Sequence, residues 1–133
     1  MSTQTAPELQ QLYEGAAREF AKRVLQRFPD VVHSVVLYGS VARGTATENS
    51  DVDVLVLRVN GTPSRDDMVD ISESIDFENG FRTFVFATAM TPDRLQRLIA
   101  GGFPIANAVL REGEVLHDDG TFEGIRKAAT GNG

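Results

Sequence analysis

The sequence predicts an α/β (α+β) fold built on a small mixed, largely antiparallel sheet with flanking helices. Segments rich in strand-forming residues alternate with amphipathic segments whose apolar residues recur at helical spacing. The link between the first two strand segments is too short for the full crossover helix that parallel pairing requires. The 133 residues contain no internal repeat, and we expect a single domain over 1–133. We also expect the helices to lie on one face of the sheet.

The elements follow in order from periodicity and from turn residues. Apolar residues at steps of three and four predict a first helix from about Pro7 to near Pro29. Strand propensity and alternation predict strands over 31–38, 52–59, 82–89 and 114–117. Further helices are expected at 41–43, after Ser64, after Thr91 and at 103–110. Ser64 and Thr91 are favourable N-caps, since their hydroxyl groups accept from backbone N–H groups of the first turn.

The packed core is expected to span about residues 7–118, with loose ends at 1–6 and 128–133. Four phenylalanines, Phe77, Phe81, Phe84 and Phe86, are suited either to stacking on a nucleotide base or to the core. Because Phe84 and Phe86 alternate along a strand, we expect that pair to lie in the core.

Composition excludes several classes of function. A net charge of −6 argues against broad nucleic-acid binding, so no direct contact with nucleic acid is expected. The chain has no cysteine, which excludes disulfides, thiolate catalysis and Cys-based zinc sites and suits a reducing cytoplasm. There is no signal-peptide pattern and no apolar run near the roughly 18 residues of a membrane span, so we expect a cytoplasmic protein without membrane contact.

One short segment carries the chemistry. The apolar run that ends at Tyr38 is followed by Gly39-Ser40, and ten residues later by Asp51-Val52-Asp53 at the start of the next apolar run. Gly39 has no Cβ, so backbone N–H groups there can approach a phosphate closely, and Ser40 adds a hydroxyl. A short helix beginning here would direct its free N–H groups at the same anion, with Arg43 as a nearby cation.

Asp51 and Asp53 are the candidate metal ligands. Alternate residues of a strand point to the same face, roughly 6.5–7 Å apart between Cα atoms. Magnesium needs few carboxylates when it also binds water and substrate phosphates, so this pair can hold an ion that arrives with a nucleotide. The segment is neither an EF-hand loop, since Leu55 and Val56 occupy the positions of the further acid and the glycine, nor a Walker A loop, since no Gly-Lys-Ser/Thr follows.

Each part taken alone is common in proteins, but the ordered combination is specific. Gly39-Ser40, followed after ten residues by Asp51-Val52-Asp53, resembles the signature of the DNA polymerase β-like nucleotidyltransferase superfamily. The longer segments 37–44 and 50–56 are most similar to its minimal bacterial and archaeal members. Weaker matches at 91–95 and 107–116 extend the resemblance over about residues 15–118.

The resemblance implies a polymerase β-like fold and transfer of a nucleoside monophosphate from a triphosphate, ATP, to a hydroxyl group. It implies that Asp51 and Asp53 are catalytic and hold Mg²⁺, that Gly39 and Ser40 hold the β and γ phosphates, and that Arg43 assists. Many minimal members pair with a small helical HEPN protein, a ribonuclease toxin. In such pairs the nucleotidyltransferase is the antitoxin, and some attach AMP to a tyrosine of the toxin, so a hetero-oligomer with a HEPN-type toxin is expected.

The chain departs from the family pattern in one respect. Active members carry a third carboxylate on the strand that corresponds to 82–89, and this strand has no acid. Glu78 could reach in from the preceding turn, whereas Arg111-Glu112-Gly113 is interpreted as a turn without a catalytic role. One alternative is a catalytically weak or inert nucleotidyltransferase-fold module that neutralises its partner by binding alone. Another is a nucleotidyltransferase acting on a small molecule.

Overall fold

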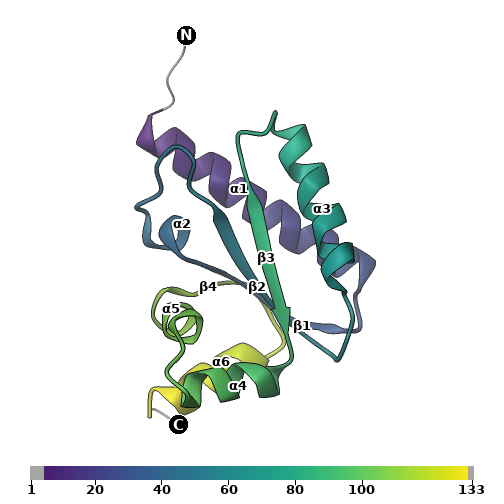
Figure 1. Ribbon diagram of the computed structural model, residues 1–133, viewed down its shortest axis with the longest axis vertical. Coiled ribbons are helices and arrows are strands. Elements are labelled where there is room, and N and C mark those ends of the chain that lie inside the picture. The colour runs from purple at the N-terminus through teal and green to yellow at the C-terminus, as the bar shows by residue number, and fades with distance from the viewer. Residues whose placement is uncertain (1–4, 132–133) are drawn as a thin grey trace.

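The computed structural model describes residues 5–131. A four-stranded sheet has the order β3-β2-β1-β4. The elements in chain order are α1 (Ala6–Arg27), β1 (Val32–Tyr38), α2 (Ser40–Arg43), β2 (Val52–Arg58), α3 (Arg65–Glu78), β3 (Val85–Met90), α4 (Pro92–Ala100), α5 (Pro104–Glu112), β4 (Glu114–Asp118) and α6 (Thr121–Ala129). Strand β1 is antiparallel to β2 and β4, and β3 is parallel to β2 (Figure 1). The mixed, largely antiparallel sheet is confirmed.

Helices cover both faces of the sheet, so the prediction of helices on one face is wrong. Val35 of β1 and Val54 of β2 belong to a core packed against α1 and α3. Val36 and Leu55, their neighbours along the strands, belong to a second core formed with α4, α5 and α6. Both strands are nearly continuous apolar runs, which is the pattern of strands that are buried on both faces.

The predicted caps are present. Ser64 accepts from Asp67 N–H at 3.1 Å, and the Asp67 carboxylate accepts from Ser64 N–H in return, which completes a capping box for α3. Thr91 caps α4 by accepting from Arg94 N–H. Thr5, which was not predicted as a cap, begins α1 through a capping box with Glu8. These local signals set the starts of α3 and α4 as the sequence predicts.

The packed chain extends beyond the predicted limit of residue 118. Helix α6 contributes Phe122 and Ile125 to the second core, and Phe122 is fully buried. Thr5 and Ala6 likewise cap and begin α1, so the loose ends predicted at 1–6 and 128–133 are wrong where they overlap the helices; residues 1–4 and 132–133 lie outside the described part of the chain.

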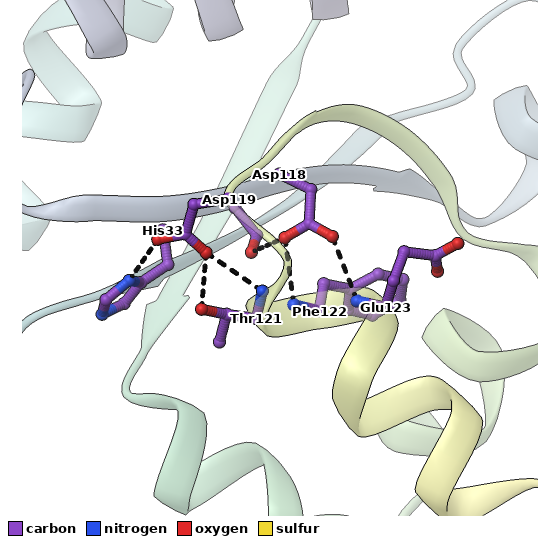
Figure 2. Close-up of polar contacts among 7 residues, drawn as sticks. His33, Asp118, Asp119, Thr121, Phe122 and Glu123 are labelled. Carbon is purple, nitrogen blue, oxygen red and sulfur yellow. Dashed lines mark hydrogen bonds and ion pairs between the residues drawn. The ribbon is translucent and has the colours of Figure 1, made fainter. Parts of the chain in front are cut away.

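Helix α6 gave little sequence signal because its cap comes from the preceding strand. The Asp118 carboxylate accepts from Phe122 N–H at 3.0 Å, from Glu123 N–H at 3.1 Å and from the buried Ser34 hydroxyl at 2.7 Å (Figure 2). Burial works to raise the pKa of Asp118, but these hydrogen bonds outweigh it and lower the pKa. One carboxylate thus ties β1, β4 and α6 together.

Asp119 continues the same network. Its carboxylate accepts from the Thr121 hydroxyl at 2.5 Å and from Thr121 N–H at 3.0 Å, and it pairs with His33 Nδ1 at 2.8 Å (Figure 2). The Thr121 hydroxyl, followed by His33, lowers the pKa of Asp119 to about 2. The contact with Asp119 gives His33 a structural role.

Phe84, which directly precedes β3, and Phe86 on β3 are not in the core, contrary to expectation. Phe84 is 57% exposed and Phe86 is 47% exposed. Strand β3 is at the edge of the sheet, and Phe86 alternates with Val85, which does face the core of α1 and α3. Alternation therefore identified the correct periodicity but the wrong face.

In the part of the chain described here, no helix combines the length and hydropathy needed to cross a bilayer.

Replacing Asp118 should destabilise the protein. In Asp118→Ala, the Ser34 hydroxyl and two N–H groups of α6 lose their acceptor, at a cost of about 1–3 kcal/mol of unfolding free energy. Urea unfolding followed by circular dichroism measures the loss. Asp70→Ala, which removes an exposed carboxylate of α3, is the control and should change stability by less than about 0.5 kcal/mol. Equal stability of the two variants would contradict the capping role.

Candidate functional site

The turn between β1 and α2 requires glycine. Gly39 has φ +79° and ψ −158°, a conformation that L side chains rarely adopt. A Cβ at this position would lie 2.5 Å from Asp53 Oδ2, which is far inside van der Waals contact. The backbone of Gly39 and the carboxylate of Asp53 are therefore direct neighbours, as the sequence motif predicts.

Helix α2 is a single turn between two glycines. Gly44 ends it in the left-handed conformation with φ +76°, and the Gly44 N–H bonds back to the carbonyls of Ser40 and Val41. The first intrahelical bond runs from Arg43 N–H to Gly39 O, so the N–H groups that precede Arg43 have no acceptor within the helix. These donors, with the Ser40 hydroxyl, are suited to an anion.

Helix α1 holds this segment in place. Gln10 Nε2 donates to Val41 O at 2.6 Å, and Tyr13 Oη donates to Thr47 O at 3.0 Å. Within the loop, Thr47 N–H donates to Ser50 Oγ at 2.8 Å. Helix α1 thus contacts both α2 and the middle of the loop that leads to Asp51 and β2.

The two candidate metal ligands sit in different surroundings. Asp51 is exposed at the end of the loop, whereas Asp53 is half-buried on β2. Burial, and then the charge of Asp51, raise the pKa of Asp53, while Arg43 opposes the rise. A cation bound at Asp53 would favour its ionised form and oppose this rise.

Asp51 and Asp53 can bind a magnesium ion only if other groups complete its coordination shell. In the described residues, no group of three or more His, Cys, Asp or Glu side chains is placed to hold a metal ion. Two carboxylates suffice for magnesium when phosphate oxygens and water complete its octahedral shell. The donors of Asp51 and Asp53 therefore suit an ion that is bound together with a nucleotide.

Glu112, which the sequence interpretation assigned to a turn, reaches the same site. At the end of α5, its Oε1 accepts from Gly39 N–H at 3.3 Å and its Oε2 accepts from Arg43 at 2.7 Å. The carboxylate thus engages the backbone N–H and the guanidinium that were predicted to bind phosphate. Only its place in the closing segment of the resemblance, at 107–116, could have drawn attention to it.

Glu78, considered as a replacement for the third acid, is held elsewhere. Its carboxylate pairs with Arg23 of α1 through two hydrogen bonds, of 2.6 and 3.0 Å. The pairing lowers the pKa of Glu78 through the hydrogen bond from Arg23. On β3, the residue in register with Asp53 is Phe86, so the neighbouring strand offers a ring where an acid was sought.

The nearby acid Asp76 has a structural role. It is buried, accepts from the Thr83 hydroxyl at 2.7 Å and from Val85 N–H at 3.2 Å, and so fixes the start of β3. Burial raises the pKa of Asp76, and the hydrogen bonds from Thr83 and Val85 oppose the rise. Its carboxylate is occupied by these contacts.

Comparison with known proteins agrees with the geometry. The family model described as a nucleotidyltransferase domain matches residues 17–88, a range that runs from α1 into β3 and includes both Gly39 and Asp53. The chain belongs to the nucleotidyltransferase family. It is an enzyme of that class, and the predicted resemblance is confirmed.

Two relatives from Methanocaldococcus jannaschii carry more specific names. The chain is 30% identical over 104 residues to "Putative protein adenylyltransferase MJ1305", covering 78% of this chain and 71% of that protein. It is 28% identical to "Putative protein adenylyltransferase MJ0604" over 78% of this chain and 97% of that protein.

Solved structures share the fold of this nucleotidyltransferase. A crystal structure of a toxin–antitoxin with AMP-PNP matches with a TM-score of 0.55 at 15% identity, covering 86% of this chain and 84% of that one. A mutant of the toxin–antitoxin MntA-HpeT gives 0.57 at 14% identity with the same coverage. A crystal structure described as that of "a putative nucleotidyltransferase from Sulfolobus solfataricus" gives a TM-score of 0.54 at 19% identity, covering 89% of this chain and 91% of that one. Similarity at this level of identity shows the fold.

The raised pKa of Asp53 makes a prediction about stability. Because folding favours its neutral form, ionisation of Asp53 costs stability as pH rises from the ordinary value of 3.8 through the raised pKa. Without divalent metal, Asp53→Asn should therefore be at least as stable as the wild type at pH 7, and the difference should shrink as pH falls toward 3.8 and below. Urea unfolding in EDTA across pH 3–7.5 tests this. If the variant is less stable than the wild type at pH 7 and equally stable at low pH, ionised Asp53 stabilises the fold, and the prediction is wrong.

Proposed function

We propose that this nucleotidyltransferase is a Mg²⁺- and ATP-dependent protein adenylyltransferase, the antitoxin that modifies a HEPN-type ribonuclease toxin. The observation that carries the proposal is the direct apposition of the Gly39 backbone, at the start of an anion-binding turn, and the Asp53 carboxylate. The names of the relatives, the toxin–antitoxin neighbours and the AMP-PNP in one of them support it.

Each site residue has a defined role in this proposal. The N–H groups at Gly39 and Ser40, the Ser40 hydroxyl and the Arg43 guanidinium bind the β and γ phosphates. Asp51 and Asp53 would hold magnesium, which when bound neutralises charge on the phosphates and supports displacement at the α-phosphorus. The rest of the catalytic effect comes from positioning, since phosphoryl-type transfer needs few covalent steps from the protein.

The transfer balances without any further reactant. The hydroxyl oxygen of the acceptor forms a bond to the α-phosphorus of ATP. The bond from that phosphorus to the bridging oxygen of the β-phosphate breaks, and pyrophosphate leaves with the electron pair. The acceptor proton passes to solvent water. Gly39 and Ser40 hold the departing phosphates, which orients the nucleotide for attack from the opposite side.

The surroundings of the reaction follow from the same proposal. The partner is a HEPN-type toxin in a hetero-oligomer, and the expected compartment is the cytoplasm, which supplies ATP and suits a chain without cysteine. No membrane or direct nucleic-acid contact is proposed.

A second candidate is a module that neutralises its partner by contact alone. It is favoured by one observation: Phe86, and no acid, is in register with Asp53 on β3, so no third carboxylate from that strand faces the site. The two candidates differ in whether the partner leaves the encounter carrying AMP.

Removing either aspartate should abolish transfer. Asp51→Asn and Asp53→Asn keep the size of the side chain and remove the charge that would hold magnesium, so label transfer from α-phosphate-labelled ATP into a bound partner should fall by at least about a hundredfold. Proteins of the source cell's extract, separated by gel electrophoresis and autoradiography, give the readout.

The control for that experiment is Asp70→Asn, which changes an exposed carboxylate of α3 and should leave labelling unchanged. Circular dichroism verifies that each variant is folded. If the wild type labels no protein in an extract shown to contain its binding partner, the contact-only module is the correct function. Undiminished labelling by both aspartate variants would exclude Asp51 and Asp53 from the catalytic site.

Glu112 should compete with the nucleotide. Its carboxylate occupies Gly39 N–H and Arg43, so an incoming triphosphate must displace it. Glu112→Gln removes the negative charge and keeps the shape, and it should tighten ATP binding by roughly three- to tenfold, or about 0.7–1.4 kcal/mol. Isothermal titration calorimetry with Mg-ATP measures this, with Glu114→Gln as the control. Weaker binding would mean that Glu112 instead holds Arg43 in place for the phosphates.

A further inference from the structure

The outer edge of β3 is open. Among the described residues, the order β3-β2-β1-β4 gives β3 a neighbouring strand on one side only. Val52 N–H donates to Phe84 O at 2.9 Å, so every second residue from Phe84 onward directs its backbone groups to β2. The residues between them, Val85, Ala87 and Ala89, therefore direct their N–H and C=O groups to the open edge.

Only the first of these three positions is capped by the protein itself. Both oxygens of the Asp76 carboxylate accept from Val85 N–H at 3.2 Å. Within residues 5–131, no side chain covers Ala87 or Ala89 in the same way. An uncovered row of backbone donors and acceptors is a template on which another strand can pair.

A groove of about 520 Å³ runs along this edge, between β3 and α3, which lie side by side (Figure 1). Met68 and Val69 of α3 line one wall, and Phe86 and Ala87 line the other. Val69 is 39% exposed, although it is a valine on a helix that packs against the core. Apolar pockets beside free backbone groups are the two features with which a sheet edge binds an extended segment.

Two arginines stand at one end of the groove. A cavity of about 290 Å³, lined by Arg58, Arg65 and Met68, continues along residues 86–89. The Nε of Arg58 is buried and has no hydrogen-bond partner among the described residues. No ion pair within residues 5–131 includes either arginine. A carboxylate is the group that such guanidinium groups bind best, through charge-assisted hydrogen bonds.

We propose that this edge and groove bind an extended segment of a partner protein, which adds to the sheet as a further strand. Ala87 and Ala89 supply the backbone hydrogen bonds, and the segment presents apolar side chains at alternate positions to Met68 and Val69. A carboxylate of the segment binds Arg58 and Arg65. This docking site is separate from the proposed catalytic site, since neither cavity is lined by Asp51 or Asp53.

The charges of α3 place the segment and disfavour a second copy of this chain. Glu73 lines the groove two turns after Arg65, so the carboxylate of the segment is expected at the arginine end only. Asp66, Asp70 and Glu73 recur at steps of four and three, and all three are exposed. Symmetric pairing of two β3 strands would bring two such acidic helices together, whereas a single extended segment brings none.

Binding is tested with two synthetic peptides and without nucleotide, so the result does not depend on transfer activity. The peptides are acetyl-Thr-Val-Thr-Val-Thr-Glu-Thr-amide and the same sequence reversed, because an added strand can run in either direction. Each is titrated into the ¹⁵N-labelled full chain and followed by NMR. We expect one of them to shift amides centred on Ala87 and Ala89. Replacing its Glu by Gln should weaken binding roughly three- to tenfold.

The arginines are tested from the side of the protein. Arg65→Gln changes an exposed residue, and it should weaken binding of the Glu peptide roughly three- to tenfold while leaving the Gln peptide unaffected. Arg58→Gln should do the same, with circular dichroism to verify the fold. Arg94→Gln, an exposed arginine of α4, is the control and should change neither affinity. An equal loss for both peptides in Arg65→Gln would overturn the carboxylate site.

N-methylation of the peptide tests strand addition itself. Only alternate N–H groups of an added strand face β3, so methylating one alternate set should abolish binding and methylating the other should not. Equal effects of the two sets would overturn strand addition, as would the absence of shifts with both peptides at about 1 mM.

Light scattering and hydrogen exchange of the protein alone test the competing occupant. We expect a form in which the amides of Ala87 and Ala89 exchange rapidly, because nothing covers them. A dimer in which both amides are protected would mean that a second copy occupies the edge, and the proposal would be wrong.

Discussion

The rest of the site depends on the register between β1 and β2. Antiparallel pairing ends with Tyr38 opposite Asp53, so the next residue, Gly39, turns directly over the Asp53 carboxylate. A shift by one residue would move Asp53 to the other face of the sheet and into the core under α1. Because both strands are buried on both faces, packing in the two cores fixes this register strongly. The same packing therefore fixes the position of Asp53 relative to Gly39.

The position of the site follows from where the helices stop covering the sheet. Helices α1 and α3 cover one face completely enough to bury every valine of β2 that points to it. On the other face, α4, α5 and α6 cover Leu55 and Leu57 but leave the beginning of β2, with Asp53, accessible at its edge. Asp53 is in register there with the exposed Phe86 of β3, and the end of α5 reaches the neighbouring turn through the contact of Glu112 with Gly39.

Carboxylates and one guanidinium set the charge around Gly39 and Asp53. Asp51 and Asp53 repel one another, and Arg43 offsets part of that repulsion. Glu112 in turn holds Arg43 and the Gly39 N–H, so a carboxylate stands where the family resemblance expects phosphate. A nucleotide that brings magnesium supplies the cation that the aspartates lack and an anion that can replace Glu112. Nucleotide and metal are therefore expected to bind as a unit.

Local sequence determined the elements and the motif. Periodicity located the strands and α1, short-range capping set the starts of α3 and α4, and the Gly39-Ser40 turn and alternation of Asp51 and Asp53 needed only neighbouring residues. Tertiary structure alone decided what covers each face. Apolar alternation shows that one side of a strand differs from the other, but not which side packs, so Phe84 and Phe86 were misplaced and the helices were expected on one face. Likewise α6 takes its cap from Asp118, and Glu112 reaches Gly39 from 73 residues away, contacts that no local pattern encodes because they exist only once the sheet has formed.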